Sequence, residues 1–133
     1  MGRILTLRGV LSRNQKERIM MVDSSVTSTG WKVLDFEMMN LTNGQYLTLG
    51  ILSTIDETFT FPDWDKNQVI GIVKHSATQE KNMLLDYNHV IVNSLYLHNV
   101  DSSNDAAYLV VLEEMSIDAK TNILYQLKES AQA

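Results

Sequence analysis

The chain has 133 residues, of which 44% are hydrophobic and 20% charged, a composition typical of a globular protein with a sizeable core. It contains no cysteine, which excludes a disulfide scaffold, a cysteine zinc site and a thiol nucleophile. No apolar run approaches the roughly 18 residues that span a bilayer, and Arg3, Thr6 and Arg8 interrupt the segment where a signal peptide would be apolar. We therefore expect one domain over residues 1–133 with no membrane span and no export by a signal peptide.

The charged residues are distributed unevenly. Eleven basic residues stand against sixteen acidic ones, yet residues 1–18 carry +4 and the remainder carries −9. Because arginine pairs with carboxylate and phosphate alike, the basic segment predicts contacts with a neighbouring copy of the chain or with nucleic acid. The alternative is that these side chains are solvated or pair with acids of the same chain. The candidate contact residues are Arg3, Arg8, Arg13, Lys16 and Arg18.

Apolar and polar residues alternate with a period of two in several short segments, which is the pattern of half-buried β-strands. In chain order, the predicted strands cover residues 3–11, 18–23, 31–39, 46–52, 57–61, 69–75, 89–98 and 107–115. In the third of them, the alternation places Leu34, Phe36 and Met38 on the core face. It places Asp35 and Glu37 on the opposite face.

The pair Asn43-Gly44 lies between the third and fourth predicted strands. Both residue types tolerate the positive φ that two-residue hairpin turns require. The sequence therefore predicts that residues 31–39 and 46–52 pair as an antiparallel hairpin.

The end of the chain has a helical periodicity instead. Ser116 or Asp118 can cap a helix in which apolar residues recur at Ile123, Leu124 and Leu127. A short C-terminal helix is therefore predicted at about residues 117–130. Together with about eight strands and turns rich in Gly, Asn and Asp, this indicates a mainly β protein. The predicted fold is an antiparallel β-sandwich of the jelly-roll type with one C-terminal helix.

One segment resembles the start of a calcium-binding loop. Asp63, Asp65 and Asn67 occupy its first three ligand positions. The sixth position is Gln68 where a sharp turn needs Gly, and the twelfth is Lys74 where a bidentate Glu is required. The segment is therefore interpreted as an ordinary turn, and we expect no metal and no cofactor.

The sequence contains no recognisable catalytic arrangement. His75, His89 and His98 lack the spacing of a zinc pair, and no G-x-S-x-G or S-x-x-K motif accompanies the serines. Glu113 and Glu114 are neighbours on a predicted strand and point to opposite faces, so they cannot act as an acid and base pair. We therefore expect the chain not to be an enzyme.

Of the two tryptophans, only Trp64 lies in a segment that the sequence predicts to be a loop. It lies between two acids that would repel phosphate, which argues against stacking on nucleic acid bases. Trp64 is therefore a candidate loop contact for a sugar or a protein.

The two ends of the chain contain several distinctive segments. They are RILTLRG at 3–9, LSR at 11–13, YLVVLEE at 108–114, IL at 123–124 and LKES at 127–130. In these segments the chain resembles small β-rich virion structural proteins of environmental phages and viruses. The resemblance covers roughly the first 13 and the last 30 residues, and it includes no catalytic signature. The resemblance implies a capsid-associated subunit that is present in many copies in one shell.

The leading hypothesis is therefore a viral capsid or virion structural protein that acts by self-association. Its expected partners are copies of itself and other virion proteins, with contact to packaged nucleic acid as a further candidate. Its expected location is the virion, after assembly in the host cytoplasm. The alternative hypothesis is a small non-catalytic module that binds a carbohydrate or a protein.

Overall fold

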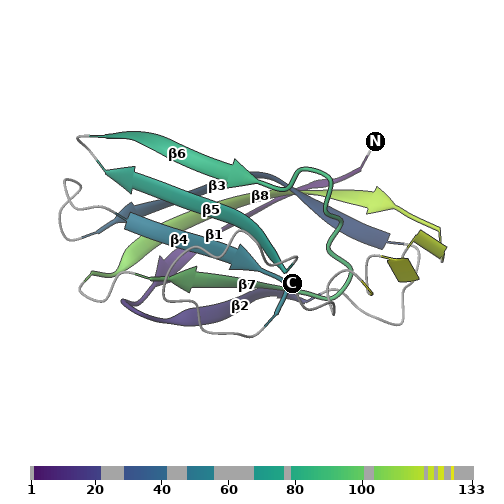
Figure 1. Cartoon of the computed structure of the whole chain (residues 1–133), viewed down its shortest axis with the longest axis horizontal. Helices are drawn as coiled ribbons and strands as arrows, with labels where there is room; N and C mark the ends of the chain where they lie inside the picture. Colours follow the sequence, from purple (N-terminus) through teal and green to yellow (C-terminus); the bar gives the residue numbers. More distant parts are fainter. Residues whose placement is uncertain are drawn as a thin grey trace.

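A computed structural model supplies the architecture of the chain (Figure 1). The structure describes residues 2–21, 29–41, 48–55, 68–76, 79–100, 104–118, 120–121, 123–124 and 127. Eight strands are present in this part of the chain: β1 (Ile4–Leu11), β2 (Lys16–Met21), β3 (Thr29–Asn40), β4 (Thr48–Ser53), β5 (Val69–Ser76), β6 (Gln79–Leu85), β7 (Ser94–Asn99) and β8 (Ala106–Ser116). The protein is mainly β, as predicted.

The strands form two antiparallel sheets that pack face to face in a sandwich-like arrangement (Figure 1). One sheet has three strands in the order β1-β8-β3, and the other has five in the order β2-β7-β4-β5-β6. The ladders are nested, because β1 pairs with β8, β2 with β7 and β4 with β5. The chain therefore passes repeatedly from one sheet to the other.

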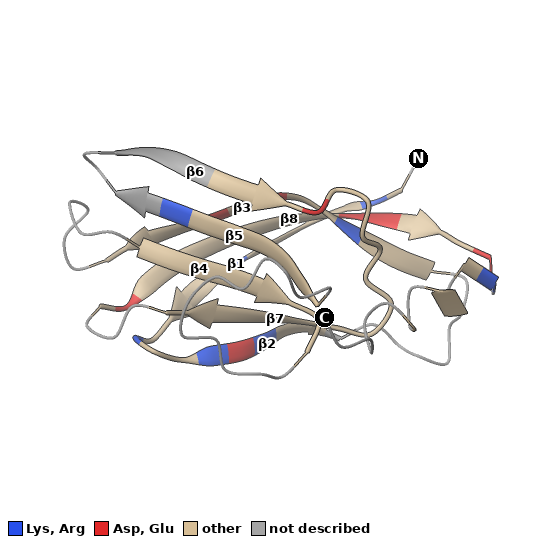
Figure 2. Ribbon diagram, viewed as in Figure 1, with Lys and Arg blue, Asp and Glu red and all other residues tan. Residues whose placement is uncertain are grey.

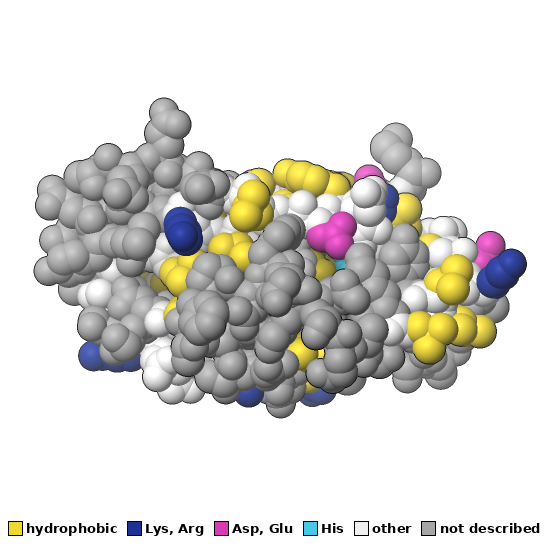
Figure 3. Space-filling model, in the orientation of Figure 1, with side chains coloured by type: hydrophobic (Ala, Val, Ile, Leu, Met, Phe, Trp, Pro, Cys, Tyr) yellow, Lys and Arg dark blue, Asp and Glu magenta, His cyan; other side chains and the backbone are white. Residues whose placement is uncertain are grey.

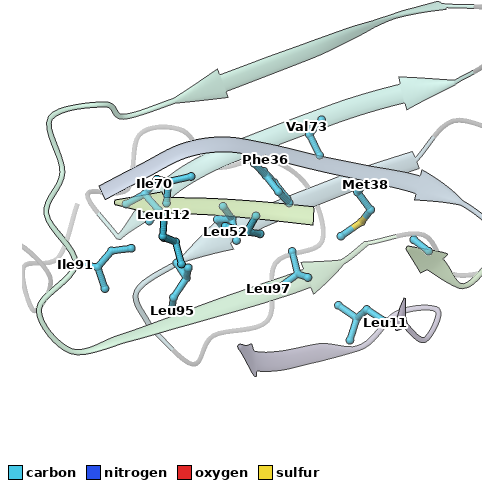
Figure 4. Close-up of a cluster of buried hydrophobic side chains, with 13 residues drawn as sticks. Leu11, Phe36, Met38, Leu52, Ile70, Val73, Ile91, Leu95, Leu97 and Leu112 are labelled. Carbon is cyan, nitrogen blue, oxygen red and sulfur yellow. The ribbon is translucent and has the colours of Figure 1, made fainter. Parts of the chain in front are cut away.

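The main hydrophobic core lies between the two sheets (Figure 4). Phe36 and Met38 of β3 reach it from one side, and Leu52 and Leu97 reach it from the five-stranded sheet. All four are at most 2% exposed, which confirms the predicted core positions of Phe36 and Met38. Burying side chains of this size contributes about 1.5–3 kcal/mol each to folding.

A β-bulge in β3 changes which side chains face this core. Val33 lies opposite Leu112 and Asp35 lies opposite Val111, so Leu34 is an extra residue between two ladder pairs. The bulge reverses the alternation at this point, with Val33 buried and Leu34 39% exposed. The prediction that Leu34 faces the core was therefore wrong.

The predicted hairpin between the third and fourth strands was also wrong. β3 pairs with β8 in one sheet, whereas both edges of β4 are occupied by β5 and β7 in the other. Gly50 of β4 instead lies beneath Phe36 and Met38 across the core. A Cβ on Gly50 would lie 2.9 Å from Met38 Sδ and 3.0 Å from Phe36 Cζ, so the glycine permits the close approach of the sheets. Asn43-Gly44 lie outside the described residues.

Most other strand predictions are confirmed, with three differences. β2 begins two residues earlier than predicted, and β7 covers only the second half of the predicted segment 89–98. Within the first half, Ile91 forms a single antiparallel bridge with Trp31. β6 was not predicted, because its polar sequence QEKN at residues 79–82 lacks alternation. The predicted strand at 57–61 lies outside the described residues.

The five-stranded sheet is also buried on its outer face around β4 and β5. A second, smaller cluster there contains Ile51, Val69 and Ile72. Because side chains are buried on both faces of β5, its sequence from Val69 to Val73 shows no polar alternation.

The predicted C-terminal helix lies largely outside the described residues. Asp118 accepts a hydrogen bond of 2.6 Å from the backbone N–H of Thr121, which is the contact that a helix N-cap makes. This hydrogen bond lowers the pKa of the Asp118 carboxyl. None of the described residues belongs to a helix long and apolar enough to span a membrane.

Candidate functional site

Arg3 is bound to an acid of its own chain. Its guanidinium donates two hydrogen bonds to the Glu114 carboxylate, from Nε to Oε1 at 3.2 Å and from Nη2 to Oε2 at 2.6 Å. This bidentate contact raises the pKa of Arg3 and lowers the pKa of Glu114. It joins the start of β1 to β8, so Arg3 already has an acidic partner within its own chain.

Arg13 also contacts an acid of its own chain, at the turn between β1 and β2. Its backbone N–H donates to Asp105 Oδ1 at 2.9 Å, and its Nε lies 3.7 Å from the same oxygen. The next residue, Asn14, has a φ of 52°, which asparagine tolerates in a tight turn. The Asp105 carbonyl accepts a hydrogen bond from Leu41 N–H, so this acid also ties the turn to the end of β3.

Arg8 lies on the outer face of the three-stranded sheet. Arg8 of β1 pairs with Leu109 of the central strand β8, and Leu109 also pairs with Glu37 of β3. The three side chains therefore form one row across the sheet. Lys16 and Arg18 lie elsewhere, on β2 at the edge of the five-stranded sheet. They share one face of that strand, and Figure 2 shows the basic residues of β2 beside an acidic one.

The structure therefore does not bring the five predicted basic residues together. Two of them, Arg3 and Arg13, form ion pairs within the chain, as the alternative interpretation of the charge distribution predicts. Arg8 lies on one sheet, and Lys16 and Arg18 lie on the other. A single continuous basic patch is not formed by these side chains.

Trp64 and the first five positions of the calcium-like loop, residues 63–67, lie outside the described residues. The second half of that segment forms β5, in which Lys74 pairs with Leu49. Within the described ranges, no three His, Asp or Glu side chains lie close enough together to hold a metal ion.

A buried serine and histidine pair, which no sequence motif indicates, lies in the five-stranded sheet. Ser53 Oγ and His98 Nε2 are 2.8 Å apart, and both residues are almost completely buried. Ser53 Oγ also donates its proton to the Ile55 carbonyl at 2.9 Å. Because a hydroxyl has one proton, His98 Nε2–H must donate to Ser53. This is the reverse of the arrangement in which histidine activates a nucleophilic serine.

A second buried polar group holds the loops at one end of the sandwich. The side-chain amide of Asn99 donates to the carbonyls of Leu11 at 3.2 Å, Ser12 at 3.4 Å and Asn104 at 3.0 Å. Its backbone N–H donates to the carbonyl of Gln15 at 2.9 Å. Asn99 therefore joins the β1–β2 turn to the segment before β8, a role that a polar residue at the end of an apolar run could have indicated.

Tyr108 of β8 is partly buried and packs against the main hydrophobic core. Burial raises the pKa of its hydroxyl, and the nearby Glu17 carboxylate adds to the effect. The hydroxyl lies beside Gly9 of β1, where a Cβ would be only 2.7 Å from it. The Tyr108 hydroxyl therefore stays protonated at neutral pH, and the side chain packs against the main hydrophobic core.

Several large hydrophobic side chains are exposed. In the view of Figure 3, hydrophobic atoms reach the surface beside β6 and near the end of β8. The exposed set is Ile4, Val10, Leu34, Met39, Leu41, Leu84, Tyr87, Ile123, Leu124 and Leu127. Of these, Ile4 and Val10 lie on β1, and Leu34 and Met39 lie on β3, so both edge strands of the three-stranded sheet carry exposed apolar residues.

A surface depression of about 480 Å³ lies at the start of β1 and the end of β8. It is lined by Gly2, Arg3, Glu113, Glu114, Met115 and Ser116. None of these is aromatic, and its charged groups include the Arg3 and Glu114 pair.

Comparison of the chain with protein-family models, with curated proteins and with solved structures gives no match.

Proposed function

We propose that the chain is a viral capsid or virion structural protein that acts by self-association in a shell. The observation that carries this proposal is the nested pairing of β1 with β8, β2 with β7 and β4 with β5 in two facing sheets. This is the pattern produced when a long antiparallel ribbon folds over on itself into a jelly roll, an architecture used by viral capsid proteins.

The ladders from β8 to β3 and from β7 to β4 are also those of such a roll. One pairing departs from it. The same nesting would place β6 beside β3, whereas β6 extends the five-stranded sheet beyond β5. The sheets therefore have three and five strands instead of four each, and the proposed jelly roll is a variant form.

The segments that resemble virion proteins support the proposal in one further respect. RILTLRG at 3–9 and YLVVLEE at 108–114 come from opposite ends of the chain, yet they pair as β1 and β8. These two segments therefore form one continuous part of the three-stranded sheet.

We infer that the protein has no catalytic role and no cofactor. In the buried Ser53 and His98 pair, the serine donates to the Ile55 carbonyl and accepts from the histidine, which is the opposite of the hydrogen bonding in a catalytic pair. The polar groups that the fold buries, such as Asn99, join loops and strands to one another. These buried polar groups therefore have a structural role in the fold.

The proposed partners are further copies of the chain and other virion proteins, and the proposed location is the virion. Contact with packaged nucleic acid would fall to Lys16 and Arg18, which share one face of β2. Because the net charge of −5 disfavours binding to nucleic acid, attraction between unlike surfaces of neighbouring copies is the contact we favour.

The test is the assembly state of the purified full chain by mass photometry and negative-stain electron microscopy. Closed or regular assemblies of many copies are expected. A monomer that stays a monomer at high concentration, and binds a sugar or an unrelated protein instead, would overturn the proposal in favour of a small binding module.

A further inference from the structure

β1 is an edge strand with an unpaired row of backbone groups. Its ladder with β8 has no register shift from Ile4 to Leu11. Arg3 carbonyl accepts from Glu114 N–H, so the odd-numbered residues of β1 hydrogen-bond to β8. The even-numbered residues direct N–H and C=O away from β8, and no described residue bonds to those groups. They are Ile4, Thr6, Arg8 and Val10.

The edge of β3 is protected in ways that β1 is not. The Asp35 carboxylate accepts the N–H of Phe36 at 2.9 Å, which covers an edge donor with the chain's own side chain. Trp31 exchanges both of its backbone hydrogen bonds with Ile91. The bulge at Leu34 also interrupts the strand, and each of these devices hinders pairing with another chain.

The edges of the five-stranded sheet are irregular as well. β2 has a register shift between Arg18 and Met20, and it begins with the charged run KER at 16–18. The β5–β6 ladder shifts between Lys74 and Ser76. Bulges and charges of this kind protect edges from association. Among the described strands, β1 is therefore the regular edge that is left open.

We propose that β1 pairs antiparallel with β1 of a second copy of the chain across a two-fold axis at Leu7. The two three-stranded sheets would then become one continuous six-stranded sheet. This inference deepens the proposed function by naming one contact through which copies associate, and its role in a shell rests on that function.

The register follows from the open backbone groups and the exposed side chains. Even-numbered residues must face even-numbered residues, and the axis at Leu7 places Ile4 opposite Val10 of the second copy. These two side chains are 57% and 59% exposed in the subunit, and each would cover the other. An axis at Arg8 would oppose two arginines, and an axis at Thr6 would place Ile4 opposite Arg8.

The side chains of β1 that face the core also favour pairing with β1 of a second copy. Leu5 and Leu7 are only partly buried against the core, although they point toward it. Leu7 would lie directly opposite Leu7 of the second copy at a position where Cα atoms are about 4.5 Å apart. Both faces of β1 would therefore lose exposed apolar surface on pairing, which is the driving force for association.

The absence of native cysteine permits a direct test of this register. Ile4→Cys and Val10→Cys are made as separate single variants of the full chain and mixed under mild oxidation. In the proposed pair the two positions have Cα atoms about 5.5 Å apart, within disulfide range. Two copies of position 4 lie six residues apart along the strands, or about 20 Å, so neither variant alone should cross-link. We expect a covalent dimer in the mixture only.

Cross-linking of either variant alone, or none in the mixture, would overturn the pairing. If mass photometry still shows assemblies, self-association survives through another surface; if the wild type is a monomer throughout, the proposed function fails as well. A second measurement uses Thr6→Pro, which removes an outward N–H, against Thr6→Ala, which keeps it. The proline variant should lose assembly at an unchanged melting temperature, while the alanine variant should assemble. Assembly of both variants would contradict the inference.

Discussion

The Ser53 hydroxyl on β4 and the His98 imidazole on β7 share a buried hydrogen bond of 2.8 Å within the five-stranded sheet. Because Ser53 gives its own proton to the Ile55 carbonyl, it acts toward His98 as an acceptor. The pair therefore connects two neighbouring strands and the turn after β4 by polar contacts inside an apolar environment, where such contacts are stronger than in water.

Replacing Ser53 by Ala should destabilise the fold, because it leaves the buried Nε2–H of His98 without this acceptor. The expected loss is about 1–3 kcal/mol in the free energy of unfolding, measured by urea denaturation. Ser12→Ala, at an exposed serine, is the matched control and should change stability by less than about 0.5 kcal/mol. Equal effects of the two substitutions would refute the structural role of the pair.

Phe36→Ala and Leu34→Ala test the bulge in β3. Phe36 is fully buried, so its truncation should cost about 3–5 kcal/mol. Leu34 is the extra residue of the bulge and is 39% exposed, so its truncation should cost less than about 1 kcal/mol. Thermal and urea unfolding of both variants gives the comparison. A larger loss for Leu34 would show that the register assigned to β3 is wrong.

Asn99→Ala should loosen one end of the sandwich. The substitution removes an amide that donates to three backbone carbonyls and so joins the β1–β2 turn to the segment before β8. A loss of about 2–4 kcal/mol is expected, together with faster amide hydrogen exchange in the turn between β1 and β2. Gln15→Ala is the control, since its exposed side chain is lost while its carbonyl still accepts from Asn99. Unchanged exchange in the Asn99 variant would contradict this assignment.

The Arg3 and Glu114 pair predicts a specific loss of stability in acid. The hydrogen bonds from Arg3 lower the pKa of Glu114 in the folded state, so the carboxylate stabilises the fold above its unfolded pKa of about 4.3. That stability is lost as pH falls through the lower, folded pKa. Glu114→Gln should therefore flatten the decline of unfolding free energy below about pH 4.5, while Glu113→Gln should keep the Arg3 contact. Identical pH profiles for wild type and Glu114→Gln would exclude the effect.

The arginines should divide into two groups in their effect on association. Arg3 and Arg13 pair with acids within the subunit, so replacing both with Gln should leave assembly nearly unchanged. Arg8 and Arg18 lie on exposed strand faces, and replacing both with Gln should weaken assembly at low salt. Wild-type assembly should weaken as the Debye length falls from about 10 Å to about 3 Å. Light scattering against salt concentration distinguishes the two double variants. Equal weakening of assembly in both double variants would refute the division.

Local periodicity was sufficient to predict the strands that have one buried face and a regular ladder. β1 is the clearest case, because it alternates along its length and pairs with β8 without a register shift. Phe36 and Met38 were also placed correctly in the core, because the part of β3 that contains them is regular. The charge separation along the chain and the absence of cysteine likewise follow from the residues alone.

Tertiary structure alone decided which sheet each strand joins. Asn43-Gly44 indicates a turn, but a turn signal does not specify whether the next strand pairs beside β3 or crosses to the opposite sheet. Here β8, from the far end of the chain, occupies one edge of β3, and β4 is enclosed by β5 and β7. The observed ladders place the apolar faces of both sheets against one core, and this long-range burial overrides the local turn signal.

The same physical reason explains the residues that the sequence could not place. The bulge at Leu34 depends on how β3 bends over the core, and the roles of Ser53 and Asn99 depend on neighbours far away in the chain. The five candidate basic residues were grouped by sequence, yet the winding of the chain between sheets separates them. Periodicity is a property of one strand, whereas a site is a property of several strands brought together, and their packing alone determines which side chains meet.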